Sequence, residues 1–103
     1  MAEGCSASEP YVLRVLGDSM APEFWDGCIV VIEPAYSAPD QAYVTAEVDG
    51  EIVLRQLVKD GGRRFLKPLN GAYPVVELGA QSVLCGVVVQ RAGTKRAHRK
   101  HYL

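Results

Sequence analysis

The apolar runs of this sequence are short, and that shortness constrains its fold more than any other feature. They are rich in β-branched residues and end at glycine, proline or aspartate, a pattern typical of strands joined by turns. We therefore expect a mostly β domain with at most one short helical turn, at Ala21–Asp26. The candidate strands are Tyr11–Leu16, Cys28–Glu33, Ala42–Val48, Glu51–Val58, Arg63–Pro68 and Ser82–Arg91.

Two turn sequences organise the middle of the chain. The pair Asp49-Gly50 favours a tight hairpin turn, and Asp60-Gly61-Gly62 favours a second one a few residues later. Together they predict a meander of three antiparallel strands. In the second hairpin we expect Lys59 to lie opposite Arg63.

The composition fits one globular domain without cofactors. The chain has 103 residues, of which 49% are hydrophobic and 22% charged, which suits a single core and argues against disorder. Its three cysteines are odd in number and lack CxxC spacing, so we expect no disulfide framework and no metal site. Cys28 and Cys85 lie in apolar runs and are expected to be core residues. No leader peptide or membrane-length apolar run is evident, so we expect a cytoplasmic protein without membrane contact.

The net charge of -1 conceals an uneven distribution. Residues 1–90 hold all 12 acids and six bases, whereas residues 91–103 hold the other five bases. We accordingly separate an N-terminal arm (1–10), a central domain (11–91) and a basic C-terminal tail (92–103). The tail is expected either to be solvated and mobile or to contact nucleic acid weakly, and both alternatives stay open. The candidate nucleic-acid-binding residues are Lys95, Arg96, Arg99 and Lys100.

Residues 15–22 break the strand pattern and carry the candidate chemistry. A strand here runs directly into Gly17, Asp18 and Ser19. A serine at such a junction can expose its hydroxyl while the backbone N–H groups of Ser19 and Met20 form an oxyanion hole, which suits acyl transfer. The alternative is ordinary turn chemistry, in which Asp18 or Ser19 caps the turn that follows.

This segment also carries a family resemblance. Gly17-Asp18-Ser19-Met20, followed by Asp26-Gly27 and an apolar strand, resembles the serine motif of the LexA-like serine peptidases, the self-cleaving domains of LexA, UmuD and phage repressors. Residues 43–57 are similar to the second motif of that family, and residues 65–76 and 83–90 resemble its later segments. The resemblance spans residues 11–91. It implies a twisted, partly closed antiparallel sheet and a homodimer.

In that family a serine nucleophile works with a lysine general base. Ser19 matches the serine, but the lysine position falls on Arg55. An arginine stays protonated in proteins, and lowering its pKa by about five units would cost about 7 kcal/mol. We therefore expect catalysis to be lost or greatly weakened. As a rescue, the expected hairpin register would place Lys67 directly opposite Arg55, where it could supply an amine near Ser19.

Three functions remain open at this point. The first is an impaired peptidase-type domain that dimerises or binds a peptide segment of a partner by β-strand addition. The second is an active peptidase that cleaves a partner in trans, and the third is a nucleic-acid-associated accessory protein that uses the tail. Family members cut an Ala-Gly or Cys-Gly bond ahead of the serine, and Ala2–Tyr11 contains neither dipeptide. We therefore expect no self-cleavage of the family type in this chain.

Overall fold

The protein is built almost entirely of strands. The computed structural model describes residues 8–35, 37–79, 82–92 and 100–102, and no helix occurs within these ranges, so none of them could cross a membrane as a helix. The predicted turn at Ala21–Asp26 is present as successive turns, with one hydrogen bond of 2.9 Å from the Phe24 N–H to the Met20 carbonyl. The mostly β prediction is therefore confirmed. The strands are β1 (Tyr11–Arg14), β2 (Ile29–Pro34), β3 (Tyr43–Val48), β4 (Glu51–Asp60), β5 (Arg63–Lys67), β6 (Val76–Glu77), β7 (Ser82–Ala92) and β8 (Lys100–His101).

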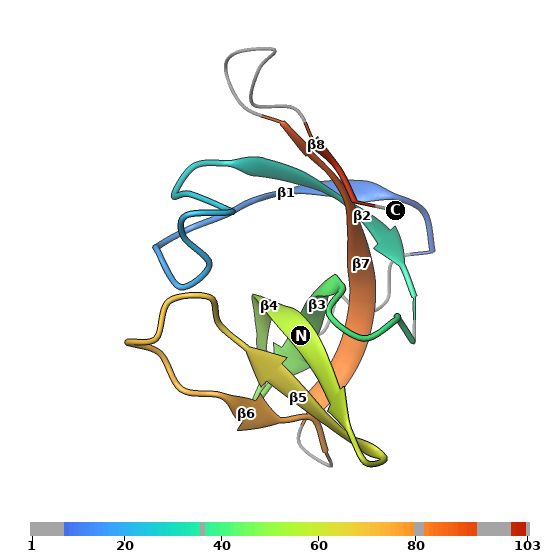
Figure 1. The fold of residues 1–103 in the computed structure, drawn as a ribbon. Helices are drawn as coiled ribbons and strands as arrows, with labels where there is room; N and C mark the ends of the chain where they lie inside the picture. Colours follow the sequence, from blue (N-terminus) through green and yellow to red (C-terminus); the bar gives the residue numbers. More distant parts are fainter. Residues whose placement is uncertain (1–7, 36, 80–81, 93–99, 103) are drawn as a thin grey trace.

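These strands form one antiparallel sheet in the order β1-β2-β7-β3-β4-β5-β6, with β8 added to β7. The long strand β7 curves through the molecule and joins two halves (Figure 1). Its C-terminal half pairs with β2 and β8, and its N-terminal half pairs with β3. Since β1 and β6 each pair with one neighbour among the described strands, the twisted sheet stays open.

The close crossing of β7 with its neighbours depends on Gly86. A Cβ atom at this position would lie 2.5 Å from the Ile32 Cγ2 atom and 3.0 Å from the Glu33 carbonyl oxygen. Both distances are below van der Waals contact, so only glycine fits without a shift of the strands. This residue therefore allows β2 and β3 to approach β7 from its two edges.

Two hydrophobic clusters stabilise the two halves, and one of them brings distant polar residues together. Met20 from the turn after β1 and Leu54 from β4 are buried in the same cluster. Their chain neighbours Ser19 and Arg55 therefore lie side by side, although 36 positions separate them. The first cluster consists of Val15, Met20, Phe24, Cys28, Val30, Ile32, Leu54 and Val88. The second consists of Ala38, Val44, Ala46, Leu57, Leu66, Leu78, Leu84 and Val87.

The register of the second hairpin differs from the expected one. The turn contains only Gly61 and Gly62, with φ values of +57° and +87°, so Asp60 pairs with Arg63. Lys67 consequently lies opposite Gln56 rather than opposite Arg55. A shift of one residue reverses which face a side chain occupies, so the predicted Arg55–Lys67 alignment is wrong.

Two further expectations need correction. Cys28 and Cys85 are both buried, as expected, and Cys28 is free, but Cys85 is disulfide-bonded, although the number and spacing of the cysteines predicted no disulfide framework. The C-terminal tail is also not wholly a solvated arm. Residues 100 and 101 form β8, which pairs with Gln90 and Arg91 of β7.

Candidate functional site

The turn that carries Ser19 is closed at its base by backbone hydrogen bonds. The Val15 N–H donates to the Cys28 carbonyl at 2.8 Å, and the Gly27 N–H donates to the Val15 carbonyl at 2.7 Å. The Gly17 N–H donates to the Asp26 Oδ1 atom at 2.8 Å, and Gly17 has a φ of +86°, a conformation that favours glycine. Gly17 and Asp26 therefore have structural roles that explain their place in the motif.

A second loop, between β5 and β6, holds the Ser19 turn from the other side. The Asn70 N–H donates to the Ser19 carbonyl at 3.0 Å, and the Asn70 Nδ2 atom donates to the Asp18 carbonyl at 3.2 Å. The Tyr73 hydroxyl donates to the Asp18 Oδ1 atom at 2.6 Å. Sequence reasoning missed both Asn70 and Tyr73, because no motif or spacing connects them with a turn about 50 positions earlier.

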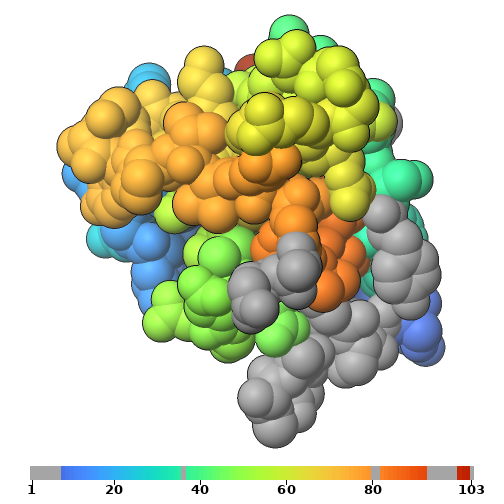
Figure 2. Space-filling model, turned by 90° about the horizontal axis from the view of Figure 1, so that it is seen from below, coloured from blue at the N-terminus to red at the C-terminus, as the bar shows by residue number. Residues whose placement is uncertain are grey.

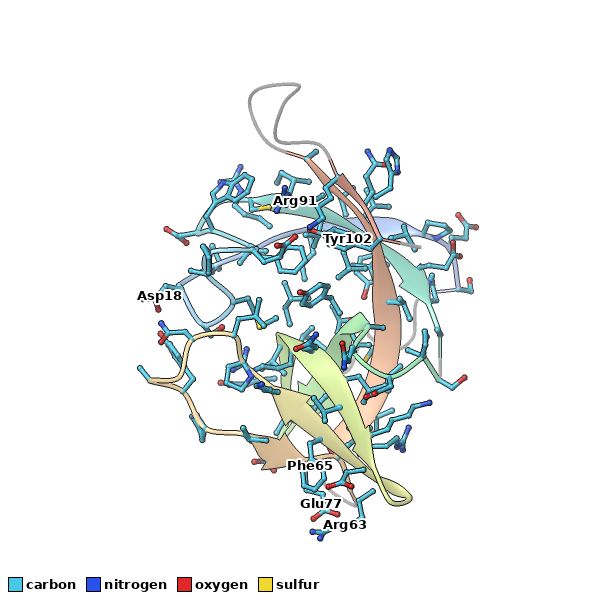
Figure 3. The ribbon with its side chains drawn as sticks, in the orientation of Figure 1. Asp18, Arg63, Phe65, Glu77, Arg91 and Tyr102 are labelled. Atoms are coloured by element: carbon cyan, nitrogen blue, oxygen red, sulfur yellow. The ribbon has the colours of Figure 1, made fainter. Side chains whose placement is uncertain are left out.

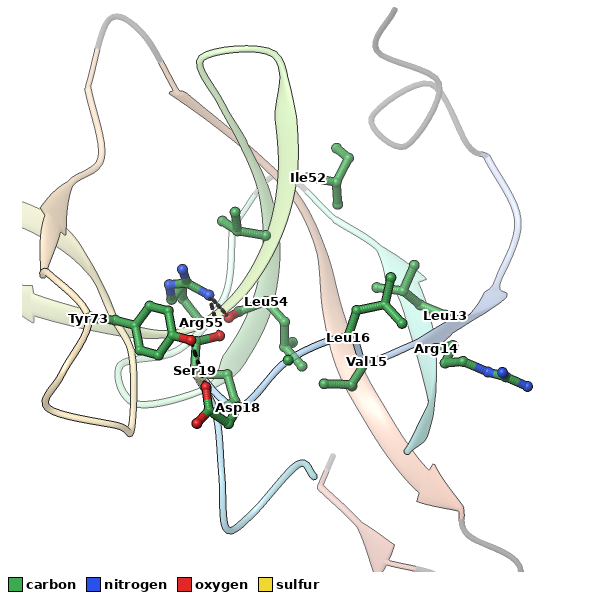
Figure 4. Close-up of a pocket in the computed structure, with 13 residues that line it drawn as sticks. Leu13, Arg14, Val15, Leu16, Asp18, Ser19, Ile52, Leu54, Arg55 and Tyr73 are labelled. Atoms are coloured by element: carbon green, nitrogen blue, oxygen red, sulfur yellow. Dashed lines mark hydrogen bonds between the residues drawn. The ribbon is translucent and has the colours of Figure 1, made fainter. Parts of the chain in front are cut away.

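Arg55 contacts Ser19 directly. Its Nη1 atom donates to the Ser19 Oγ atom at 3.0 Å and to the Leu54 carbonyl at 2.7 Å (Figure 4). The arginine is half-buried, and this burial lowers its pKa from the usual value while the nearby Tyr73 acts weakly in the opposite sense. No ion pair joins Arg55 to a carboxylate in the part of the chain that the structure describes.

The two residues open onto a cleft of about 380 Å³. Seen from below, the blue Ser19 turn lies against the gold loop after β5 and close to the green turn between β3 and β4 (Figure 2). The lining of the cleft is mainly aliphatic. Its polar groups come from Ser19, Arg55, Asp18 and Tyr73 at one end of the cleft, and Arg14 lies away from that end. The lining residues are Leu13, Arg14, Val15, Leu16, Gly17, Asp18, Ser19, Met20, Ile52, Val53, Leu54, Arg55 and Tyr73.

Of the other predicted site residues, Met20 lies at the cleft and Lys67 does not. Met20 lines the cleft beside Ser19, and an oxyanion hole at their N–H groups stays a prediction. Lys67 is exposed and does not line the cleft, which removes the basis for its proposed role as a base. Lys95, Arg96 and Arg99 lie outside the described residues. Within the described ranges, no three histidine, cysteine, aspartate or glutamate side chains gather as metal ligands would.

Lys100 belongs to a compact ionic group on the far side of the Ser19 turn. The Glu23 Oε2 atom accepts hydrogen bonds from the Arg91 Nη1 atom at 3.1 Å, the Lys100 Nζ atom at 2.8 Å and the Tyr102 hydroxyl. We call these four residues the Glu23 cluster. Arg91 and Tyr102 lie together at one end of the molecule, far from the exposed Arg63–Glu77 pair (Figure 3). Lys100 is therefore paired with a carboxylate, and its contact with nucleic acid stays a prediction.

The charge of Glu23 is well compensated. Burial alone would raise the pKa of the Glu23 carboxyl, but the hydrogen bonds from Lys100 and Tyr102 and the charges of Lys100 and Arg91 outweigh it and lower the pKa. Burial and the bond to Glu23 raise the pKa of Tyr102. The Tyr102 ring also packs 5.4 Å from the rings of Phe24 and Tyr43. The C-terminal residues thus brace the turn that carries Ser19.

Comparisons with known proteins support one family. The sequence profile described as Peptidase S24-like matches residues 2–89. Repressor protein C2 of Salmonella phage P22 is 38% identical over 91 residues, which cover 82% of this chain and 42% of the repressor. The HTH-type transcriptional regulator for conjugative element SXT of Vibrio cholerae is 35% identical, and the match covers 85% of this chain and 42% of the regulator. LexA repressor 2 of Pseudomonas putida is also 35% identical, and the match covers 76% of this chain and 42% of the repressor. The chain spans about two fifths of the length of these relatives, and it belongs to the Peptidase S24-like family.

Proposed function

We propose that this chain is a peptidase-fold module in which the Ser–Lys chemistry of the family is lost or greatly weakened, and that its cleft binds a peptide segment. The observation that carries the proposal is the 3.0 Å hydrogen bond from Arg55 to the Ser19 hydroxyl oxygen. A general base must accept the serine proton, whereas the guanidinium at this position donates one. The polarity of this contact is therefore opposite to the one that activates a nucleophile.

Neutralising Arg55 is too costly to restore the chemistry. Burial lowers the pKa of Arg55, which is the direction that catalysis requires. A base at neutral pH would need a pKa about five units below the usual arginine value, which costs about 7 kcal/mol. The surroundings offer no substitute, since no lysine or histidine is among the described residues that line the cleft.

Peptide binding fits the shape and the edge of the sheet. β1 is a terminal strand, and among the described strands it pairs with β2 alone, which leaves its other edge for an added strand. The exposed Leu16 and the half-buried Leu13 and Ile52 offer aliphatic surface along the cleft. These features support an extended peptide with aliphatic side chains as the occupant.

We also propose a homodimer acting in the cytoplasm, with residues 11–91 as the peptidase-type domain. The dimer rests on the family membership, and the compartment rests on the relatives, which are named as repressors and transcriptional regulators. Sedimentation equilibrium of the purified chain checks the association state. A monomer at micromolar concentration would contradict the dimer.

The catalytic part is tested with a peptide that contains an Ala-Gly bond between aliphatic residues, followed by mass spectrometry from pH 7 to 10. We expect the wild type and Ser19→Ala to give equal, background cleavage. Arg55→Lys should exceed the wild type by about 100-fold or more, because general base catalysis contributes a factor of that order. Its rate should rise with pH as the lysine loses its proton.

Two controls separate the alternatives. The double variant Ser19→Ala/Arg55→Lys should return to background, which shows that the gained activity uses Ser19. Wild-type cleavage that disappears in Ser19→Ala would instead establish an active peptidase that works in trans, and it would overturn the proposal.

A further inference from the structure

The charge of Arg55 lacks a partner within the protein, as far as the described residues show. Arg91 is paired with Glu23 and Arg63 with Glu77, but Arg55 bonds only to the neutral oxygens of Ser19 and Leu54. A half-buried cation without a counter-ion is unfavourable, because it loses hydration without an ionic partner. A site that keeps such a cation is suited to an anion supplied by a ligand.

Unused donors remain on Arg55 and Ser19, two residues that line the cleft. Only the Nη1 atom of Arg55 is hydrogen-bonded within the described residues, so Nε and Nη2 retain donors. Ser19 accepts the bond from Arg55 at its Oγ atom, which leaves the Ser19 hydroxyl proton available to donate. A guanidinium and an adjacent hydroxyl that both donate form a fork suited to a carboxylate.

The other charged groups of the cleft do not compete for this role. The Arg14 guanidinium points away from Ser19 and Arg55 (Figure 4). The Asp18 carboxylate is engaged by the Tyr73 hydroxyl at 2.6 Å. A carboxylate in the cleft would therefore meet Arg55 as its cation.

The polar end of the cleft is bordered by a second loop. Asn70 and Tyr73 bond to Ser19 and Asp18, so the loop between β5 and β6 is joined to the Ser19 turn beside Arg55. An extended chain that lies along the aliphatic walls would meet this loop at the polar end. A chain terminus fits such a position better than the middle of a strand does.

We propose that the cleft binds the C-terminal carboxylate of an extended, aliphatic peptide of a partner protein, with Arg55 and Ser19 holding the carboxylate. This inference rests on the proposed peptide-binding function and deepens it. Leu13, Leu16 and Ile52 would contact the aliphatic side chains, and the charge-assisted hydrogen bonds would fix the position of the terminus. In this role Ser19 is a hydrogen-bond donor rather than a nucleophile.

The test compares three peptides by calorimetry and by ¹⁵N NMR of the labelled chain: acetyl-Ala-Val-Leu with a free carboxylate, its C-terminal amide, and the amide acetyl-Glu-Val-Leu-NH₂. We expect the free acid to bind about tenfold more tightly than its amide, and the shifts of the Arg55 Nε–H and the Ser19 N–H to move on binding. The side-chain acid should bind no better than the neutral amide.

Matched variants locate the effect. Arg55→Met should remove the preference for the free acid and keep the weaker binding of the amide, whereas Arg14→Met, which removes a charge elsewhere in the same lining, should retain the preference. Ser19→Ala, a smaller change, should reduce the preference by about threefold, equivalent to about 0.7 kcal/mol.

The outcomes are distinguishable. Equal binding of acid and amide, or a preference that survives Arg55→Met, would overturn the carboxylate site while peptide binding stands. Tightest binding of the side-chain acid would overturn the choice of a chain terminus. Absence of binding by all three peptides would overturn both the carboxylate site and the peptide-binding function.

Discussion

Two charged side chains flank the Ser19 turn, and their surroundings differ sharply. Glu23, behind the turn, accepts hydrogen bonds from Arg91, Lys100 and Tyr102. Arg55, in front of it, bonds only to the neutral oxygens of Ser19 and Leu54. A compensated buried charge can contribute to stability, whereas an uncompensated one costs free energy unless a ligand completes it. The difference indicates that the Glu23 side of the turn stabilises the fold, whereas the Arg55 side is suited to bind a ligand.

The largest effect on the free energy of unfolding is expected when the contacts of Glu23 are removed. Glu23→Ala removes the acceptor of three donors, and the Arg91 side chain that it leaves is only 15% exposed. We expect the free energy of unfolding to fall by about 2–3 kcal/mol, below the value for a fully buried pair because the Glu23 side chain is 22% exposed. Urea unfolding followed by circular dichroism measures this change.

The exposed pair Arg63–Glu77 supplies the control for that prediction. Its side chains are 64% and 46% exposed, so solvent screens the interaction and Glu77→Ala should have little effect. Equal losses of unfolding free energy in Glu23→Ala and Glu77→Ala would show that the Glu23 cluster stabilises the fold no more than an exposed ion pair does.

Replacing Arg91 or Arg55 by methionine is expected to change the free energy of unfolding less, and it compares the two sides of the turn directly. Arg91→Met should lower the free energy of unfolding by about 1–2 kcal/mol, because it removes a charge-assisted hydrogen bond to Glu23 and the contact of its guanidinium with the Trp25 ring at 5.1 Å. Arg55→Met should change it by less than about 0.5 kcal/mol or increase it, since a half-buried cation without a partner is removed. A loss in Arg55→Met as large as in Arg91→Met would contradict the distinction.

The smallest effect concerns pH and again involves Glu23. Its pKa is lowered in the folded protein, so its carboxylate contributes stability above the unfolded value of about 4.5, and this contribution is lost as the pH falls through the folded pKa. The difference in unfolding free energy between the wild type and Glu23→Gln should be constant from pH 7 to 5 and shrink below pH 4.5. A difference that stays constant down to pH 3 would mean that Glu23 does not titrate in this range.

The main strands could be predicted from the local pattern of apolar and turn residues. The placement of Arg55 beside Ser19 followed from the family resemblance alone. The hairpin register was off by one because Asp60-Gly61-Gly62 is compatible with turns of different length, and only the φ values of Gly61 and Gly62 distinguish them. The short strands β6 and β8 carry no apolar alternation of their own. They form because the rest of the sheet presents an edge to them.

The contacts around the Ser19 turn were harder to anticipate. Asn70, Tyr73 and Tyr102 reach it from 50 or more positions away, and no motif marks those distances. The basic residues of the tail predicted a free arm, because charge alone does not reveal that Glu23 lies within reach of Lys100. Tertiary partners of single polar side chains leave no periodic signal in a sequence.

The central claim is that Arg55 remains a cation that donates to Ser19, and the ¹³Cζ chemical shift of Arg55 measures this directly. The resonance is assigned by its absence in Arg55→Lys and followed from pH 6 to 11. We expect the chemical shift of the protonated form at neutral pH, because a guanidinium stays protonated in proteins even where burial lowers its pKa, as it does for Arg55. A transition to the neutral form at or below about pH 8 would make Arg55 a competent base and would contradict the loss of catalysis.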